Sequence, residues 1–213
     1  MDEIVRQAMA KWPSVPHCYG WLALDARGAF RMRDETAQRL HQPGDIIRHT
    51  ALLAFIYRNY AHDERGAWFF QNGPQRVYVD LEATPFIART DPVHQIVLHD
   101  GEAMTDINDV WLTDKGQLVL SNATQVAMLD DRDLAQCLPL LKNKGQVIDD
   151  SLLMQWLNSP DESLSKTILG RDIPVRWLRS NDVAARFGFI KSPVSLQRRS
   201  GFSTHPNSQP ASG

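Results

Sequence analysis

The histidines and cysteines of the chain are too scattered to predict a catalytic or metal site. His17 and Cys18 are adjacent, and neighbouring residues of a strand point to opposite faces, so a buried thiol is favoured over an imidazole-activated thiolate. His94 and His99 flank a predicted strand at an odd spacing, which places them on opposite faces of a sheet. Cys137 lies far from Cys18, and no Cys-x-x-Cys or Cys/His cluster occurs. We therefore expect reduced cysteines, no metal and no cofactor.

Two acidic clusters are the other candidates for metal chemistry, Asp130-Asp131-x-Asp133 and Asp149-Asp150. Each cluster stands just before a predicted helix, where carboxylates accept hydrogen bonds from free N–H groups and favour the positive end of the helix dipole. We interpret both clusters as helix caps. The sequence contains no Gly-x-Gly-x-x-Gly, Walker, Gly-x-Ser-x-Gly or His-Glu-x-x-His motif.

The clearest structural signal is the stretch 68–86. Between Arg76 and Glu82, apolar residues alternate with polar ones, which is the period of a strand with one buried and one solvated face. Asn72-Gly73 favours a turn, so residues 68–70 should pair with residues 76–81 as a hairpin. The polar side chains of this region predict either a binding surface or an ordinary solvated face: Gln71, Asn72, Arg76, Tyr78, Asp80 and Glu82.

Hydrophobic periodicity and turn residues predict the remaining elements. Residues 34–44 are predicted to form a loop, and Asp45 is predicted to cap a helix that carries His49 on its apolar face. We expect helices over 2–12, 45–61, 131–141, 150–158 and 180–187, hairpins over 19–33 and 111–120, and strands over 95–98, 128–129 and 174–178.

One turn pattern recurs along the chain. Residues 25–30 and 63–68 share the pattern Asp-x-Arg-Gly-Ala-aromatic, and residues 111–120 contain a tighter variant. Such a turn has an Asp that bonds its own backbone and a Gly in the left-handed conformation. The recurrence predicts a structural repeat of hairpin followed by helix; the alternative is chance, because turns of this kind are common in antiparallel sheets.

The bulk properties point to a cytoplasmic globular protein. The chain has 213 residues, 43% of them hydrophobic, and a formal net charge of −2, which gives no general attraction to phosphate backbones or acidic membranes. Charged residues interrupt the N-terminal segment, and no apolar run approaches the ~18 residues of a membrane span. We expect neither nucleic acid nor membrane as a partner.

Residues 74–86 read Pro-Gln-Arg-Val-Tyr-Val-Asp-Leu-Glu-Ala-Thr-Pro-Phe. This string resembles a signature of the bacterial family called domain of unknown function 1285, which commonly runs Pro-Val-Glu-Arg-Val-x-Ile-x-Val-Glu-Asp-Ala-Pro-Phe. The order of elements over about residues 20–156 is similar too. Gln75 stands where Glu is usual and Ala83-Thr84 where Asp-Ala is usual, as in a divergent relative. The resemblance implies two α+β units with a repeated motif, and a suggested role in signal transduction.

Together these observations predict an α+β fold of antiparallel β-sheet units, each packed by a helix. We expect an N-terminal unit over 1–91, a second unit over 92–158, a C-terminal extension over 159–196 and a disordered tail over 197–213. The expected function is that of a non-enzymatic binding or interaction module with a regulatory role and an unknown protein or small-molecule partner. The alternatives are a homodimer built through sheet edges and a hydrolase or transferase with residues from distant segments: His49, His94, His99, Asp80 and Glu82.

Overall fold

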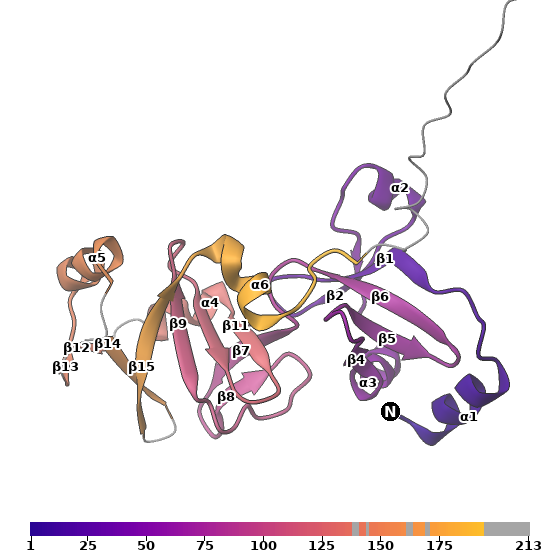
Figure 1. Ribbon diagram of the computed structural model, residues 1–213, viewed down its shortest axis with the longest axis horizontal. Helices are drawn as coiled ribbons and strands as arrows, with labels where there is room; N and C mark the ends of the chain where they lie inside the picture. Colours follow the sequence, from indigo (N-terminus) through magenta and orange to yellow (C-terminus); the bar gives the residue numbers. More distant parts are fainter. Residues whose placement is uncertain (138–140, 144, 161–163, 169–170, 194–213) are drawn as a thin grey trace, which may run out of the picture.

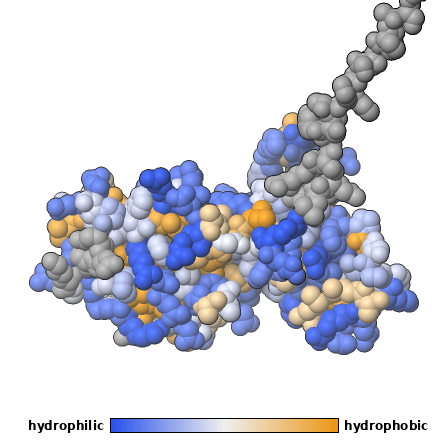
Figure 2. Space-filling model, viewed as in Figure 1, coloured by the Kyte–Doolittle hydropathy of each residue, from blue (hydrophilic) through white to orange (hydrophobic). Residues whose placement is uncertain are grey.

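The computed structural model describes residues 1–137, 141–143, 145–160, 164–168 and 171–193. Within this part of the chain, helices and strands form an α+β fold with two sheets that lie side by side along the long axis (Figure 1). The surface in view is mostly polar, with apolar side chains in scattered patches (Figure 2). No helix in the described ranges is long and apolar enough to cross a membrane.

The first sheet has the strand order β3-β2-β1-β6-β5-β4. Its hairpins are those that the sequence predicts, around the turns at Gly28 and Gly73, and the pairing Asn72↔Gln75 closes the second one. β1 and β6 at its centre are parallel, so the sheet is mixed and not purely antiparallel. Its strands are β1 (Cys18–Leu24), β2 (Phe30–Met32), β3 (Asp45–Ile46), β4 (Tyr60–His62), β5 (Trp68–Asn72) and β6 (Gln75–Leu81).

The second sheet has the order β13-β12-β14-β15-β9-β10-β11-β7-β8. It is mixed as well, because β15 runs parallel to β9 and β11 runs parallel to β7. Its strands are β7 (Phe86–Asp91), β8 (Gln95–Leu98), β9 (Asp109–Thr113), β10 (Leu118–Ser121), β11 (Val126–Leu129), β12 (Leu141–Asn143), β13 (Gln146–Val147), β14 (Leu164–Ile168) and β15 (Arg171–Leu178).

Sheet membership crosses the boundaries that the sequence predicts for the units. β7 falls in the predicted unit 1–91 but pairs in the second sheet, and β14 and β15 fall in the predicted extension 159–196 but complete the same sheet. The division into separately folding units remains a prediction. The predicted tail over 197–213 lies outside the described residues.

The helices occur close to where periodicity places them. They are α1 (Glu3–Lys11), α2 (Glu35–Arg39), α3 (Thr50–Arg58), α4 (Asp131–Cys137), α5 (Asp150–Asn158) and α6 (Val183–Phe187), with a 3-10 turn η2 (Ser180–Asp182) before α6. Asp149 caps α5 as predicted, since its side chain accepts a hydrogen bond from the Leu152 N–H at 2.8 Å. Gly188, in the left-handed conformation, ends α6.

Two local predictions are wrong in the first sheet. The predicted loop 34–44 contains α2, because Asp34 accepts a hydrogen bond from the Ala37 N–H and caps a short helix. The main helix starts at Thr50 and not at Asp45, because Asp45 pairs with Met32 as part of β3. His49 is therefore the helix cap, and its Nδ1 accepts from the Leu52 N–H at 3.2 Å. A two-residue strand with mixed polarity carries too little pattern to be read from sequence.

The recurring turns have the predicted geometry. The Asp25 Oδ1 accepts hydrogen bonds from the N–H groups of Arg27 and Ala29. The Asp63 Oδ1 accepts in the same way from the N–H groups of Arg65 and Ala67. In the third turn the Thr113 hydroxyl accepts from the corresponding N–H groups. Each turn carries a glycine at positive φ: Gly28, Gly66 and Gly116.

The hydrophobic core is continuous between the two sheets. One cluster of buried side chains extends from Leu22 in β1 to Val175 in β15. At the junction, the Phe86 ring of β7 packs edge-on against Trp68 and Tyr60, with ring centroids 5.2 and 5.9 Å apart. The junction is therefore part of the core.

Candidate functional site

A pocket of about 540 Å³ opens beside the second sheet, where α4 lies near the ends of β7, β8 and β14. It contains two cationic side chains, two carboxylates, one thiol and several neutral polar groups. The residues that matter for its chemistry are Arg89, Thr90, Asp133, Gln136, Cys137 and Lys166.

Lys166 is the chemically distinctive group of this pocket. β14 alternates, so that Leu164, Lys166 and Ile168 all point inward, and the lysine is only 3% exposed. Its Nζ donates a hydrogen bond to the Cys137 carbonyl oxygen at 3.0 Å. Burial disfavours the charged ammonium and lowers the pKa of Lys166, while burial of the Cys137 thiol raises the pKa of that group.

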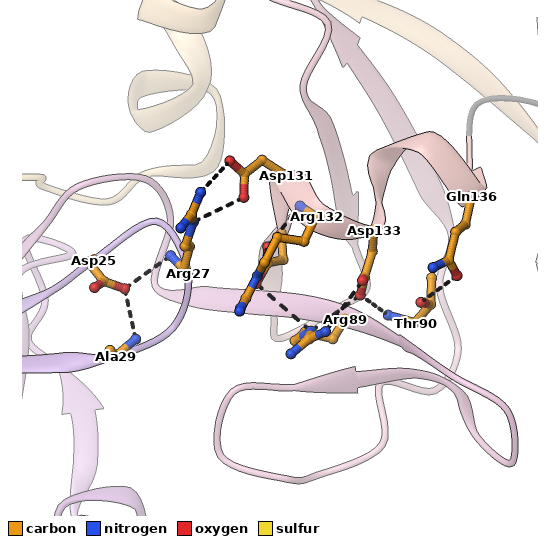
Figure 3. Close-up of polar contacts among 10 residues, drawn as sticks. Asp25, Arg27, Ala29, Arg89, Thr90, Asp131, Arg132, Asp133 and Gln136 are labelled. Carbon is orange, nitrogen blue, oxygen red and sulfur yellow. Dashed lines mark hydrogen bonds and ion pairs between the residues drawn. The ribbon is translucent and has the colours of Figure 1, made fainter. Parts of the chain in front are cut away.

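On the side of the pocket that β7 and α4 form, ion pairs and hydrogen bonds hold these two elements together (Figure 3). Asp133 accepts from the Thr90 N–H at 2.8 Å and from the Arg89 Nε at 3.3 Å. Asp130 is fully buried, and the Arg132 guanidinium holds the pKa of its carboxyl well below the usual range. These contacts fix α4 against β7, and they leave the Arg89 guanidinium already occupied by carboxylates.

The acidic cluster is thus only partly a helix cap. The Asp130 carboxylate accepts from the Arg132 N–H at the start of α4, as predicted. Asp133 instead reaches across to β7, and Asp131 forms an exposed ion pair with Arg27 at 3.1 Å, which joins α4 to the first sheet (Figure 3). No group of three or more His, Cys, Asp or Glu side chains among the described residues could hold a metal ion.

The predicted polar row lies elsewhere, on β5 and β6 of the first sheet, and the prediction of a solvated face is wrong at Tyr78 in β6 and at Gln71 in β5. Tyr78 is 3% exposed, because Tyr19 stacks on its ring with centroids 4.5 Å apart and Phe69 packs against it edge-on. Gln71 is 1% exposed, and its amide donates to the Gly73 carbonyl inside the hairpin. Both faces of this part of the sheet are covered, and alternation alone cannot reveal a second layer.

The other residues of the row are engaged separately. The Arg76 guanidinium lies over the Phe69 ring, 4.5 Å from its centroid. Asp80 forms an ion pair with Arg33, and Glu82 accepts from the Ala26 N–H at 2.9 Å. Asn72 is exposed at the hairpin. Their role as a binding surface remains a prediction.

The candidate residues for a hydrolase or transferase are not brought together. His49 caps α3, and His94 lies in an exposed turn. His99 lies among four aromatic rings at the junction: Phe30, Tyr57, Tyr60 and Phe86. No hydrogen bond, ion pair or ring contact of the described residues joins any two of the five candidates, which are His49, His94, His99, Asp80 and Glu82.

Sequence reasoning missed the pocket around Lys166. Residues 159–173 are predicted to be a linker and an extension, so the alternation Leu164-x-Lys166-x-Ile168 did not lead to the prediction of a strand. A lysine at an interior position of a strand is the available signal, because lysine is almost never fully buried without a reason. The other walls come from β7 and α4, and no sequence pattern links them to β14.

Comparisons with known proteins give a family but no activity. The search of the curated proteins found no match. Among solved structures, a DUF1285 family protein from Silicibacter pomeroyi DSS-3 is similar, with 13% identity over 83% of this chain and 96% of that chain and a TM-score of 0.45. That protein is a member of the family whose signature residues 74–86 resemble. The family model described as "Protein of unknown function (DUF2946)" matches residues 1–194, and the chain therefore belongs to that family.

Proposed function

We propose that the protein is a non-enzymatic binding module that takes a small molecule in the Lys166 pocket. The observation that carries this proposal is a buried lysine among the residues that line a pocket of about 540 Å³. Ligand pockets combine mostly apolar walls with a few placed polar groups, and this volume lies within their usual range. Ile96, Ile168 and the Cys137 side chain supply apolar wall here.

The arrangement of charges favours binding over catalysis. The carboxylate of Asp133 is held by Arg89 and the Thr90 N–H, so it is poorly placed to act as a base. No histidine is among the described residues that line the pocket. The alternative of a hydrolase or transferase remains a prediction.

The test is a thermal-shift screen of the full chain against metabolites, nucleotides and short peptides, comparing wild type with Thr90→Trp. A ligand that binds only the folded state stabilises it by about 2.7 kcal/mol at 100 times its Kd. We expect a compound that raises the melting temperature of the wild type and fails to raise that of Thr90→Trp, because the indole fills the pocket while the Thr90 N–H stays bonded to Asp133.

The matched control is Thr105→Trp, the same substitution at an exposed position outside the pocket. It should keep the full shift. A blank screen, or a shift that Thr90→Trp retains in full, would contradict binding at this pocket.

We further propose a cytoplasmic, regulatory role in which the bound molecule changes contact with a protein partner. Support comes only from the pocket and from the absence of catalytic motifs in the sequence. Capture of the same partner with and without a ligand from the screen would test it, and equal capture in both cases would argue against regulation.

A homodimer through sheet edges remains a second proposal. β3 and β4 are short edges of the first sheet, which limits pairing there, and β8 and β13 are the edges of the second. Light scattering at high protein concentration decides it, and a monomeric mass would refute it.

We also propose that the two sheets descend from one repeated unit. The order β3-β2-β1-β6-β5-β4 corresponds strand for strand to β11-β10-β9-β15-β14-β12, and in both the first and last strands of the unit are parallel, β1 with β6 and β9 with β15. A helix lies between the third and fourth strands each time, α3 and α4. An experimental structure with β9 and β15 antiparallel would contradict the repeat.

A further inference from the structure

The pocket holds an amine without a counter-ion. The Lys166 Nζ donates a hydrogen bond to the Cys137 carbonyl oxygen and also interacts with the Cys137 thiol, and among the described residues no carboxylate forms an ion pair with it. A buried ammonium without a carboxylate is costly, so such a lysine gives up its proton more readily than an exposed one. A backbone carbonyl accepts a stronger hydrogen bond from an ammonium than from a neutral amine, so this contact opposes loss of the proton, but the effect of burial is larger and the pKa of Lys166 is lowered.

Two other described lysines, Lys142 and Lys191, have surroundings that differ from those of Lys166. Lys142 forms an ion pair with Asp172 at 3.4 Å. Lys191 donates to the Glu82 carbonyl oxygen at 2.9 Å, and burial lowers its pKa too, but it lies outside the pocket. Lys191 is therefore a useful control: an amine on a backbone carbonyl, in an exposed residue that does not line the pocket of Lys166.

We infer that Lys166 is a nucleophilic amine and that the ligand of the pocket is a small aldehyde or ketone, held as a reversible imine. This inference rests on the proposed function and adds the chemical class of the ligand. Lys166 lines a cavity large enough for a compound of this kind, and the Thr90 hydroxyl and Gln136 amide, which line the same cavity, can bind its polar substituents.

The chemistry is an addition followed by loss of water. The Nζ lone pair attacks the carbonyl carbon and breaks the C=O π bond, and the oxygen takes up a proton as the nitrogen loses one. The resulting carbinolamine expels the oxygen as water and leaves a C=N bond to Nζ. Nothing is oxidised or reduced, and hydrolysis returns the free amine and the intact ligand.

The experiment uses propionaldehyde as the probe, with sodium cyanoborohydride to reduce the imine to a stable propyl amine, followed by peptide mapping by mass spectrometry. The reagent does not reduce a hemithioacetal, so the adduct reports amines and not the Cys137 thiol. At pH 7 we expect Lys166 to be labelled several-fold faster than Lys191 and the exposed Lys115. The preference should shrink as the pH approaches about 10, where ordinary lysines also lose their protons.

Two variants separate the sources of reactivity. Lys166→Met should remove the fast-labelled site, and Lys191→Met should leave it unchanged. Should Lys166→Met fail to fold, the wild-type map alone decides, because the other lysines serve as internal standards. Labelling of Lys166 no faster than that of Lys115 overturns the inference.

The outcome can be told apart from that of the proposed function. An unreactive Lys166 in a protein whose melting temperature is raised by a compound without a carbonyl group, and not in Thr90→Trp, would leave the binding module standing and refute the imine. Fast labelling of Lys166 that Thr90→Trp blocks supports both.

Discussion

At the scale of single residues, His99 is the most constrained titratable group of the junction. Its Nδ1 accepts from the Ile87 N–H at 3.2 Å, and its Nε2 is buried with no partner among the described residues. Burial lowers the pKa of His99 from 6.5 to about 4. The ring is therefore neutral at pH 7, and a second proton would have to bind Nδ1, where it would displace the hydrogen bond from the Ile87 N–H.

His99 makes the stability of the protein depend on pH. The unfolded state takes up a proton near pH 6.5 and the folded state only near pH 4, so the free energy of unfolding should decrease as the pH falls through this window, by up to about 3 kcal/mol. Urea denaturation at a series of pH values measures it. His99→Asn, whose Oδ1 replaces the Nδ1 acceptor, should show a smaller slope, whereas His94→Asn at an exposed turn should keep it. Equal slopes in wild type and His99→Asn would show that other groups dominate.

At the scale of elements, the recurring turns share one local geometry but differ in what lies against them. Gly66 has φ +78° and lies against the segment that follows α6, where its carbonyl oxygen accepts from the Ile190 N–H. Gly116 has φ +71° and faces open space. Gly116 is thus needed only for the backbone conformation of its turn, whereas Gly66 is needed both for that conformation and for close packing against a neighbouring segment.

An alanine scan of these turns separates the two roles. Gly116→Ala should lower the free energy of unfolding by about 1–2 kcal/mol, the cost of a left-handed non-glycine residue. Gly66→Ala should cost about a further 1–3 kcal/mol, because its Cβ would lie 1.9 Å from the Gly188 carbonyl oxygen and backbone must move. Chemical denaturation of both variants measures the difference, and equal losses would mean that the segment at Gly188 yields without cost.

At the scale of the whole molecule, packing and not ion pairing joins the two sheets. The Arg27–Asp131 ion pair crosses between them but is largely exposed, whereas Phe86 is buried against Trp68 and Tyr60. The C-terminal segment returns to the first sheet as well, where the Leu81 N–H donates to the Lys191 carbonyl oxygen. The sheets should therefore unfold together.

Substitutions on the two kinds of contact should differ greatly. Phe86→Ala should lower the free energy of unfolding by about 3–5 kcal/mol, since it removes a buried ring, and Asp131→Asn by less than about 1 kcal/mol. Guanidinium denaturation followed by circular dichroism gives both values, and hydrogen exchange in β5 and β9 reports whether the sheets open together. Different exchange free energies for the two strands in the wild type would show independent units.

Features that depend on local interactions could be predicted from the amino-acid sequence. Alternation and turn residues predicted the hairpins of β1–β2, β5–β6 and β9–β10, and periodicity predicted α1, α5 and α6, because the backbone hydrogen bonds of these elements close over short separations. The Asp-x-x-Gly turns were predicted for the same reason. The short β3 and α2 were missed, since two to five residues carry almost no pattern.

Which surfaces are covered and which distant residues are in contact depends on the tertiary structure and could not be predicted from local sequence patterns. Tyr78 looked solvated because its neighbours alternate, yet Tyr19 and Phe69 cover it. The pocket needs β7, α4 and β14, whose residues lie up to about 80 positions apart, and no local pattern encodes that contact. Lys166 belongs to an alternating run that can be read from the sequence, but the pocket that it lines forms only when the second sheet is assembled.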